Sequence, residues 1–315
     1  MPVRIRIVTD STANLPPDLV AGHRITVVPL QLIVGDDSYA EGVDLTPEVL
    51  ASALKRSSGV STSMPSPRAF LESYEELAAS GADEIVSIHL SAELSGTHDA
   101  ALMAARHAPV PVRVVDSTTM GMALGYAVLT AAEAAAAGEP AATVERLCLE
   151  RATSSTVLFY VNSLEHLRRG GRIGAASAFL GSAFAIKPLL TLTGGHIEPV
   201  DRLRTSSKAL ARLQELVFAA VEEATAAEAA PVDVAVHFLP GHDRSVRAAE
   251  SLAEALGQRY ADQLAGGGAL LVELGAIAAA HLGPGTIAAV VTPATEPSAG
   301  PSAGLSEGLP GQTDP

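Results

Sequence analysis

Short β-branched runs alternate with longer alanine-rich segments through the first half of the chain, and this alternation restricts the fold more than any other feature. Strands separated by helices pair in parallel, so we expect a mainly parallel, Rossmann-like sheet of three layers, covered on both faces. Ligands of such sheets bind at the C-terminal ends of the strands. The expected strands are residues 4–9, 25–34, 84–90 and 112–116, and the expected helices are residues 47–56, 67–80, 97–107 and 118–137.

The second half carries different signals. Alanine-rich helices run to about residue 152, and the pair Gly194-Gly195 then separates two apolar runs, as in a β-hairpin. We therefore predict an N-terminal α/β domain at residues 1–155, a C-terminal α/β domain with a mixed sheet at 156–292, and a disordered Pro/Ser/Gly/Ala tail at 293–315. The second domain's elements are expected at residues 156–161, 188–192, 196–201, 205–227, 232–238, 243–260, 269–274 and 286–291.

Composition and charge exclude several classes of protein. With 48% hydrophobic residues in 315, the chain has ample material for a core. The net charge of −14 disfavours nucleic acid as a partner. Because there is no uninterrupted apolar run of about 18 residues and no signal-peptide pattern, we expect a cytoplasmic protein without stable membrane insertion. A single cysteine, Cys148, rules out a disulfide framework, and no metal site is expected.

Three common motifs of enzymes are missing from the sequence. The first strand ends in Thr9-Asp10-Ser11-Thr12 instead of a Gly-x-Gly-x-x-Gly turn, so a dinucleotide site is not expected. There is no P-loop to hold ATP. There is also no Gly-x-Ser-x-Gly nucleophile elbow, which disfavours a serine hydrolase.

Turns rich in serine and threonine occur after strands or before helices. Ser11, Ser66 and Ser117 are expected mainly to cap helices. The run Ser95-Gly96-Thr97 differs, because glycine allows close approach of a ligand at a predicted helix N-terminus, where unpaired N–H groups favour an anion. A carboxylate or a phosphate would fit there.

Positive charge is concentrated between His166 and Arg212, where eight Lys and Arg residues stand against two acidic residues. One interpretation is an ordinary solvated basic face. The other is a site for a phosphate or for an acidic partner surface.

Five motifs follow one another along the chain: Thr9-Asp10-Ser11-Thr12, Thr62-Ser63-Met64-Pro65-Ser66, Leu94-Ser95-Gly96-Thr97, Gly170-Gly171-Arg172-Ile173 and His281-Leu282-Gly283-Pro284-Gly285. In this order and spacing they make the chain resemble the DegV family, from Ile7 to Gly285. The resemblance implies two α/β domains that hold one long-chain fatty acid between them, with no cofactor. It also implies a binding subunit of a fatty acid kinase, in which a separate chain supplies ATP, the acid becomes an acyl phosphate, and the product enters phospholipid synthesis.

The resemblance also implies roles for six residues. Thr62 and Ser95 would hydrogen-bond the carboxylate, and His281 would complete their network. The backbone N–H of Gly96 would add a donor. Arg172 and Arg204 would supply positive charge at the pocket mouth or for docking the kinase.

General energetics agree with a lipid ligand, since about 15 buried methylenes at ~0.8 kcal/mol each contribute up to ~12 kcal/mol. Residues 175–187, in which bulky and small side chains alternate, either line such a tunnel or form an ordinary core helix. The main alternative function is a stand-alone enzyme on a small phosphorylated or anionic metabolite, using His281 or Ser95. A pure interaction protein is the third possibility.

Overall fold

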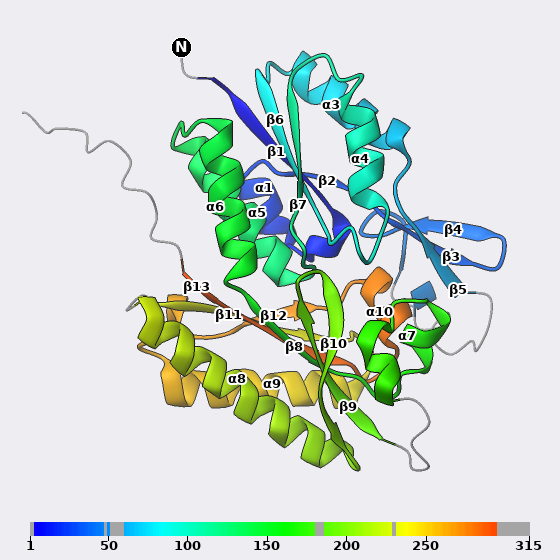
Figure 1. The fold of residues 1–315 in the computed structure, drawn as a ribbon, viewed down its shortest axis with the longest axis vertical. Helices are drawn as coiled ribbons and strands as arrows, with labels where there is room; N and C mark the ends of the chain where they lie inside the picture. The colour runs from blue at the N-terminus through cyan, green and yellow to red at the C-terminus, as the bar shows by residue number, and fades with distance from the viewer. Residues whose placement is uncertain (1–2, 47–48, 51–59, 180–185, 229–230, 295–315) are drawn as a thin grey trace, which may run out of the picture.

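The computed structural model describes residues 3–46, 49–50, 60–179, 186–228 and 231–294. They form a four-stranded sheet, a six-stranded sheet and a small three-stranded sheet (Figure 1). The strands of the four-stranded sheet precede residue 156 and those of the six-stranded sheet follow residue 155. We retain the division into two domains at this position as a proposal.

The first main sheet is parallel, in the order β2-β1-β6-β7. Helices α5 and α6 cover one face and α3 and α4 cover the other, which confirms the three-layer prediction (Figure 1). The strands are β1 (Ile5–Asp10), β2 (Thr26–Val28), β6 (Glu84–His89) and β7 (Val112–Asp116), and the helices are α3 (Pro67–Ala79), α4 (Thr97–Ala105), α5 (Met122–Ala136) and α6 (Ala141–Thr153).

Alternation along the strands explains the two covered faces. Ile7 and Val86 pack with α5 and α6, whereas Val8 and Ile85 pack with α3 and α4. Successive side chains of a strand point to opposite faces, so strands with apolar residues at consecutive positions must be covered twice. The expected cap of α3 is present, since the Ser66 hydroxyl accepts a hydrogen bond from the Ala69 N–H at 3.2 Å.

The prediction of one strand over residues 25–34 is wrong, because the chain changes sheets at Pro29. Only β2 belongs to the parallel sheet, and the following strand β3 pairs antiparallel with β4 and β5. Proline has no N–H to give to a ladder, and the Leu30 N–H is donated to the Ser11 hydroxyl at 3.0 Å. The small sheet consists of β3 (Gln31–Val34), β4 (Asp37–Ala40) and β5 (Val60–Ser63). Most of the helix predicted at residues 47–56 lies outside the described residues.

The second main sheet is mixed, in the order β10-β9-β8-β13-β11-β12, with β11 and β12 parallel and the other neighbours antiparallel. Gly194 and Gly195, both at positive φ, close the β9–β10 hairpin as predicted. The strands are β8 (Thr156–Tyr160), β9 (Lys187–Thr193), β10 (His196–Leu203), β11 (Val232–Phe238), β12 (Leu270–Glu273) and β13 (Ile287–Pro293). Because β13 includes Pro293, the predicted tail starts inside a strand, and residues 295–315 lie outside the described residues.

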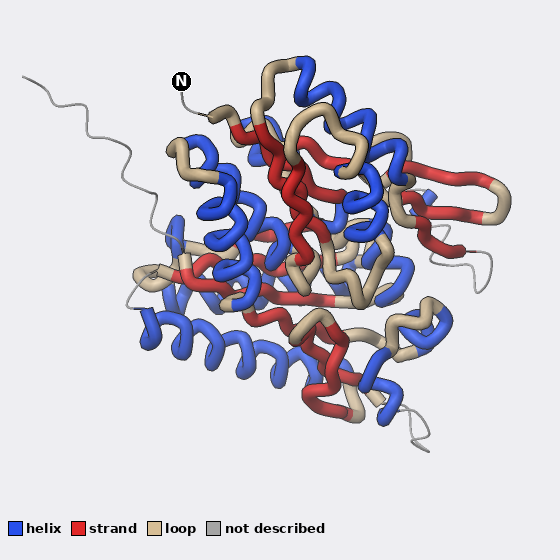
Figure 2. Tube along the Cα trace, turned by 45° about the horizontal axis from the view of Figure 1, so that its top comes forward, coloured by secondary structure: helices blue, strands red, loops and turns tan. Residues whose placement is uncertain are grey.

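One face of this mixed sheet is covered by α8 (Ser206–Glu228) and α9 (Asp243–Tyr260), which lie along the bottom of the molecule in Figure 1. Figure 2, turned from that view, shows one long helix running below the strands. Its other face packs against the first half of the chain. Phe159 and Leu190 of this face share one core with Leu32 of β3 and Met122 of α5. The halves are therefore joined through apolar side chains. Among the described residues, no helix has the length and apolar character needed to span a membrane.

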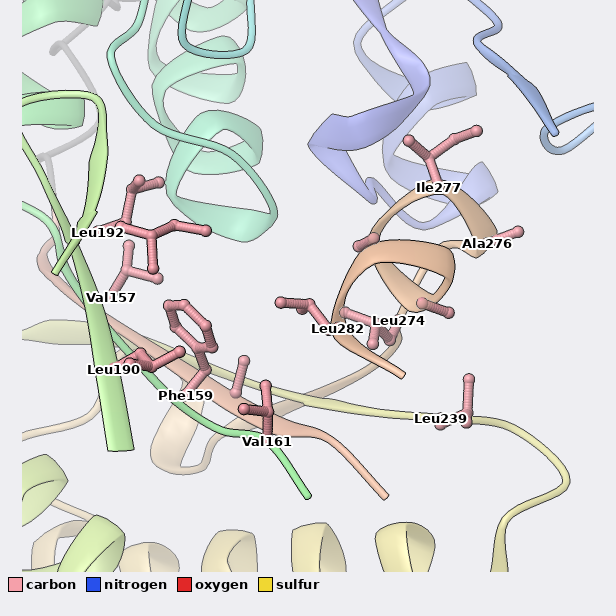
Figure 3. Packing of buried hydrophobic residues seen from close by; sticks show 14 of the residues in the cluster. Val157, Phe159, Val161, Leu190, Leu192, Leu239, Leu274, Ala276, Ile277 and Leu282 are labelled. Atoms are coloured by element: carbon pink, nitrogen blue, oxygen red, sulfur yellow. The ribbon is translucent and has the colours of Figure 1, made fainter. Parts of the chain in front are cut away.

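Several short helices were not predicted. The most important is α10 (Ala276–Leu282), which packs into the core between the two halves (Figure 3). The remaining elements are α1 (Pro17–Gly22), α7 (Glu165–Arg169) and the 3₁₀ turns η1 (Ser11–Ala13), η2 (Gly174–Phe179) and η3 (Ala265–Gly267).

Candidate functional site

A cavity of about 280 Å³ lies between the two halves of the chain. Its walls come from β5 and the loop after β6 on one side, and from β10 and α10 on the other. Five of the six predicted residues line it, which brings together segments that are up to 219 positions apart in the sequence. These are Thr62, Ser95, Gly96, Arg172 and His281.

Thr62 and His281 are in direct contact at the polar end of the cavity. The Thr62 Oγ1 atom lies 2.8 Å from His281 Nε2, within hydrogen-bond distance. Thr62 reaches this position because β5 pairs with β3 at Leu32 on the inner side of the small sheet. His281 is brought to it by the last turn of α10.

His281 is neutral at physiological pH. Burial, with smaller contributions from the positive charges of Arg172 and His166, lowers its pKa to about 4. Gly170 makes room for the ring, because a Cβ atom there would lie only 2.2 Å from His281 Nδ1. The imidazole therefore acts as a neutral hydrogen-bonding group, and the first glycine of the Gly-Gly-Arg-Ile motif has a steric function that sequence reasoning missed.

Ser95 and Gly96 lie in the loop between β6 and α4. The Ser95 hydroxyl is 2.9 Å from the Thr97 hydroxyl, and Gly96 is the N-cap residue of α4. A Cβ atom on Gly96 would lie 2.7 Å from Met64 Sδ, so this close approach of the two loops requires a small residue. The predicted helix N-terminus at this position is confirmed. It presents hydroxyl and N–H donors to the cavity.

The two predicted arginines have different positions. Arg172 lines the cavity and donates from Nε to the Leu94 carbonyl at 2.9 Å, so it ties its own segment to the loop that carries Ser95. Arg204 follows the end of β10, is exposed, and is not among the residues that line the cavity. Ile197, near the start of the same strand, does line it. The structure thus brings Arg172, and not Arg204, to the predicted site.

A smaller, almost wholly apolar cavity of about 50 Å³ adjoins the first. Met120, Ile197, Ala278 and Leu282 line both cavities. Figure 3 shows Leu282 of α10 pointing toward Phe159 of β8, which is part of the wall of the second cavity. The two cavities thus share part of their walls, and while Thr62 and His281 line only the first, the second is mostly apolar.

The segment predicted as a tunnel wall at residues 175–187 is described only in part. It begins as the 3₁₀ turn η2, in which Ala176 is buried, and residues 180–185 lie outside the described part of the chain. Phe179 and Ile186 pack against the core cluster that includes Phe159. Neither the tunnel wall nor the core helix is established for the whole segment.

A buried network of Asp10, His89, Ser87 and Tyr74 was also missed. Asp10 Oδ2 is 3.0 Å from His89 Nδ1, and His89 Nε2 is 2.8 Å from the Ser87 hydroxyl. The order Asp–His–Ser resembles a hydrolase triad. However, Ser87 is fully buried and lines neither cavity, so a substrate in either one does not meet it. Within the described residues, no three His, Cys, Asp or Glu side chains are grouped as a metal site.

Known proteins resemble this chain over nearly its whole length. Residues 4–294 match the family model described as "Uncharacterised protein, DegV family". A DegV domain-containing protein of Streptomyces coelicolor is 50% identical over 289 residues, which cover 91% of this chain and 98% of that protein.

Two solved structures share the fold and carry descriptions of their ligand. One, of a DegV family protein from Thermus thermophilus described by its fatty acid binding, has a TM-score of 0.80 at 33% identity and covers 93% of this chain and 100% of its own. The other, DegV of Bacillus subtilis, described as a fatty acid binding protein, has a TM-score of 0.78 at 28% identity, with coverages of 93% and 100%. The match over nearly the whole length, with the same architecture, shows that this chain belongs to the DegV family.

Proposed function

We propose that this protein binds one long-chain fatty acid between its two halves, with the carboxylate at Thr62, Ser95 and the Gly96 N–H. The observation that carries the proposal is the Thr62–His281 contact of 2.8 Å at the polar end of an aliphatic cavity. The fatty acid binding described for the relatives from T. thermophilus and B. subtilis supports the same ligand class.

The protonation state of His281 decides the direction of its hydrogen bond to Thr62 at the polar end of the cavity. A neutral ring protonated at Nε2 donates to Thr62 Oγ1, which leaves the threonine proton free to be donated to the carboxylate. Each hydrogen bond to a charged group contributes roughly 1.5–3 kcal/mol, so two or three such donors offset the desolvation of the carboxylate without an ion pair. They orient the ligand, and the buried methylenes provide most of the affinity.

The acid bound in this way is presented, in our proposal, to a separate kinase in the cytoplasm. The sequence contains no P-loop, and we assign the binding of ATP and phosphoryl transfer to the carboxylate to a second chain, whose acyl phosphate product then feeds phospholipid synthesis. Arg172, which is exposed and also lines the cavity, offers positive charge beside the carboxylate. Arg204, exposed after β10, is proposed as a contact for the kinase rather than for the ligand.

Ligand identity tests the binding proposal directly. Native mass spectrometry of gently purified protein is expected to find a stoichiometric C14 to C18 fatty acid. Thr62→Ala and Ser95→Ala are each expected to weaken binding about tenfold, because each removes one hydrogen bond to a charged group. Ser61→Ala is the matched control, since Ser61 is exposed on the other side of β5. An empty cavity together with no binding in titration calorimetry would refute the proposal.

The kinase step requires its own experiment. The loaded protein, ATP and a fatty acid kinase chain are mixed, and acyl phosphate is trapped with hydroxylamine as the hydroxamate. Product is expected only when both chains are present, and less of it with the Ser95→Ala variant. Turnover by this chain alone would contradict the assignment and favour a stand-alone enzyme.

A further inference from the structure

Glu41 joins the two halves of the molecule immediately behind the candidate site. It follows β4, is only 8% exposed, and accepts a hydrogen bond on Oε1 from the Ile277 N–H at 2.9 Å. The two residues are 236 positions apart. Glu41 lines neither the polar cavity nor the apolar one. Its carboxylate therefore acts on the site through the groups that it contacts, the Ile277 N–H of α10 and the Ser11 hydroxyl.

Helix α10 provides a large part of the cavity wall. Ile277, Ala278, His281 and Leu282 all line the cavity that holds Thr62 and Ser95. The helix has only seven residues, so a displacement of its first turn is transmitted to His281 at its last turn. The position of the His281 ring thus depends on what holds the start of the helix.

The first half of the chain approaches the start of α10 very closely. A Cβ atom on Gly275, the N-cap residue, would lie 2.4 Å from Asn14 Nδ2 and 2.6 Å from Glu41 Oε1. No other residue type fits at Gly275 without moving one of these side chains. The start of α10 is therefore packed closely against Asn14 and Glu41, with no space for a side chain at Gly275.

The turn after β1 supports Glu41 from the other side. The Glu41 N–H donates to the Leu30 carbonyl at 2.9 Å, and the Leu30 N–H donates to the Ser11 hydroxyl at 3.0 Å. Leu30 itself lines the polar cavity. Ser11, which we expected to cap a helix, instead ties the first turn of the chain to the segment that carries Glu41. The Thr-Asp-Ser-Thr motif thereby gains a structural role in the site.

We propose that Glu41 is a positioning residue for the fatty acid site, which holds α10, and through it His281, against the cavity. The proposal rests on the fatty acid binding proposed above. It assigns to Glu41 an effect on affinity without any contact to the ligand.

The charge state of Glu41 provides a readout that a purely structural role lacks. Burial, with a smaller contribution from the charge of Asp10, raises its pKa from 4.5 to about 7, against the lowering effect of the Ser11 hydroxyl and of the N–H groups of Ile277 and Ala276. The residues of α10 before His281 are alanine and isoleucine, and so add no charge. Within the described residues Glu41 Oε2 has no hydrogen-bond partner.

The direction of the pH effect follows from linkage. If Glu41 is released to solvent when α10 moves away, its pKa returns to the ordinary 4.5. Glu41 then binds its proton more tightly when α10 is packed against it than when α10 has moved away. The packed position of α10 is therefore favoured at low pH and is weakened as the pH rises through 7. One pKa unit corresponds to a tenfold change, so wild-type affinity is expected to fall by up to about tenfold from pH 6 to pH 8 relative to a variant that does not titrate.

Three variants test the proposal with palmitate as the probe. Glu41→Ala removes the acceptor and is expected to weaken binding about fivefold at pH 6, the usual effect of losing a helix cap. Glu41→Gln keeps an oxygen acceptor of the same length, so it is expected to bind within about twofold of wild type at pH 6. The Gln variant is also expected to lack the pH-dependent loss. Glu273→Gln, an exposed carboxylate of β12 just before α10, is the matched control.

A second measurement separates this proposal from the proposed function. The ¹⁵N shifts of the His281 ring, recorded on ligand-free protein, report its hydrogen bond to Thr62. They are expected to change in Glu41→Ala and to stay at wild-type values in Glu273→Gln. If wild type binds no fatty acid, the proposed function fails, and the His281 shifts still decide the positioning role. Unchanged affinity and unchanged His281 shifts in Glu41→Ala, or identical pH profiles for wild type and Glu41→Gln, would overturn it.

Discussion

His281 works as a neutral hydrogen-bonding group because three features of its surroundings act together. Burial removes water, Arg172 and His166 add positive charge, and Gly170 leaves space for the ring. The motif His-x-Gly-Pro-Gly marks the residue in the sequence, but its protonation state depends on neighbours that are more than 100 positions away. The sequence motif indicated His281 as a candidate residue, whereas its lowered pKa could not be predicted from the sequence.

Gly170→Ala is expected to disturb the site without touching a ligand contact. The new Cβ atom would lie 2.2 Å from His281 Nδ1, so the ring must move and its bond to Thr62 is strained or lost. We expect fatty acid affinity to fall about tenfold, the effect of roughly one hydrogen bond to a charged group. Isothermal titration calorimetry measures this affinity. Gly257→Ala is the control, because nothing lies within 4 Å of its Cβ position in α9, and alanine there should add about 0.5–1 kcal/mol of stability.

The buried histidines give a second prediction, for stability against pH. Burial lowers the pKa of both His281 and His237 to about 4, below the ordinary 6.5. A depressed pKa means that the folded state resists protonation, so this stability is present above pH 6.5 and is lost as the pH falls toward 4. Urea unfolding of His281→Gln is expected to show a smaller loss between pH 6.5 and pH 4 than wild type. If the free energy of unfolding of the variant fell with decreasing pH as steeply as that of the wild type, the prediction would be contradicted.

Turns at strand ends connect the secondary-structure elements to the site. Asp10, the last residue of β1, accepts hydrogen bonds from the Thr12 N–H on one oxygen and from the Leu90 N–H on the other, both at 3.0 Å. Leu90 lines the polar cavity at the start of the loop that leads to Ser95. One buried carboxylate thus fixes two turns at the C-terminal ends of neighbouring parallel strands, β1 and β6.

Asp10→Asn is expected to destabilise the protein strongly. The substitution keeps the shape but replaces one acceptor oxygen by an NH₂ group, which then faces an N–H donor in a fully buried position. A buried donor left without a partner costs roughly 1–3 kcal/mol, and loss of the charge adds to this. We expect the free energy of unfolding, measured in urea, to fall by about 3 kcal/mol. Asp99→Asn on the exposed surface of α4 should change it by less than about 0.5 kcal/mol.

The long regular elements were predictable from the sequence, and the short ones around the site were not. A short run rich in β-branched residues indicated β6, which is buried on both faces, and period-3.6 patterns indicated α8 and α9, which each bury one regular stripe. In contrast, β5 is four residues of Val-Ser-Thr-Ser, and α10 is seven residues buried on most sides, so neither shows a distinct period. Thr62 and His281 lie on these two elements. Sequence motifs therefore indicated Thr62 and His281 as candidate residues, whereas the hydrophobic patterns did not predict the two elements that carry them.

The molecule as a whole is held together by a core that belongs to both halves. Val157 and Leu192 of the mixed sheet (Figure 3) belong to the same cluster as Tyr126 of α5 and Leu32 of β3. Polar contacts reinforce this junction. The Met122 N–H donates to the buried His237 Nε2 at 3.2 Å. Because the candidate site lies in the same junction, its shape depends on how firmly the halves are joined.

Arg151 of α6 forms a largely buried ion pair that links the two halves. Its side chain is only 3% exposed, its guanidinium pairs with Asp233 of β11, and it lies over the Tyr126 ring at 5.5 Å. Arg151→Ala leaves Asp233 without this partner and removes packing against Tyr126. Breaking a buried pair from one side typically costs 3–5 kcal/mol, but Asp233 is 28% exposed and can be hydrated, so we expect a loss of about 3 kcal/mol.

The matched control for Arg151 is on the same helix. Arg146 pairs with Glu150 four residues along α6, and both side chains are more than half exposed. Arg146→Ala should therefore lower the unfolding free energy by less than about 0.5 kcal/mol. Calorimetry adds a second readout, because a weakened junction is expected to broaden or split the unfolding transition in Arg151→Ala and to leave it single in Arg146→Ala. Equal effects of the two substitutions would show that the halves are held by the shared apolar core alone.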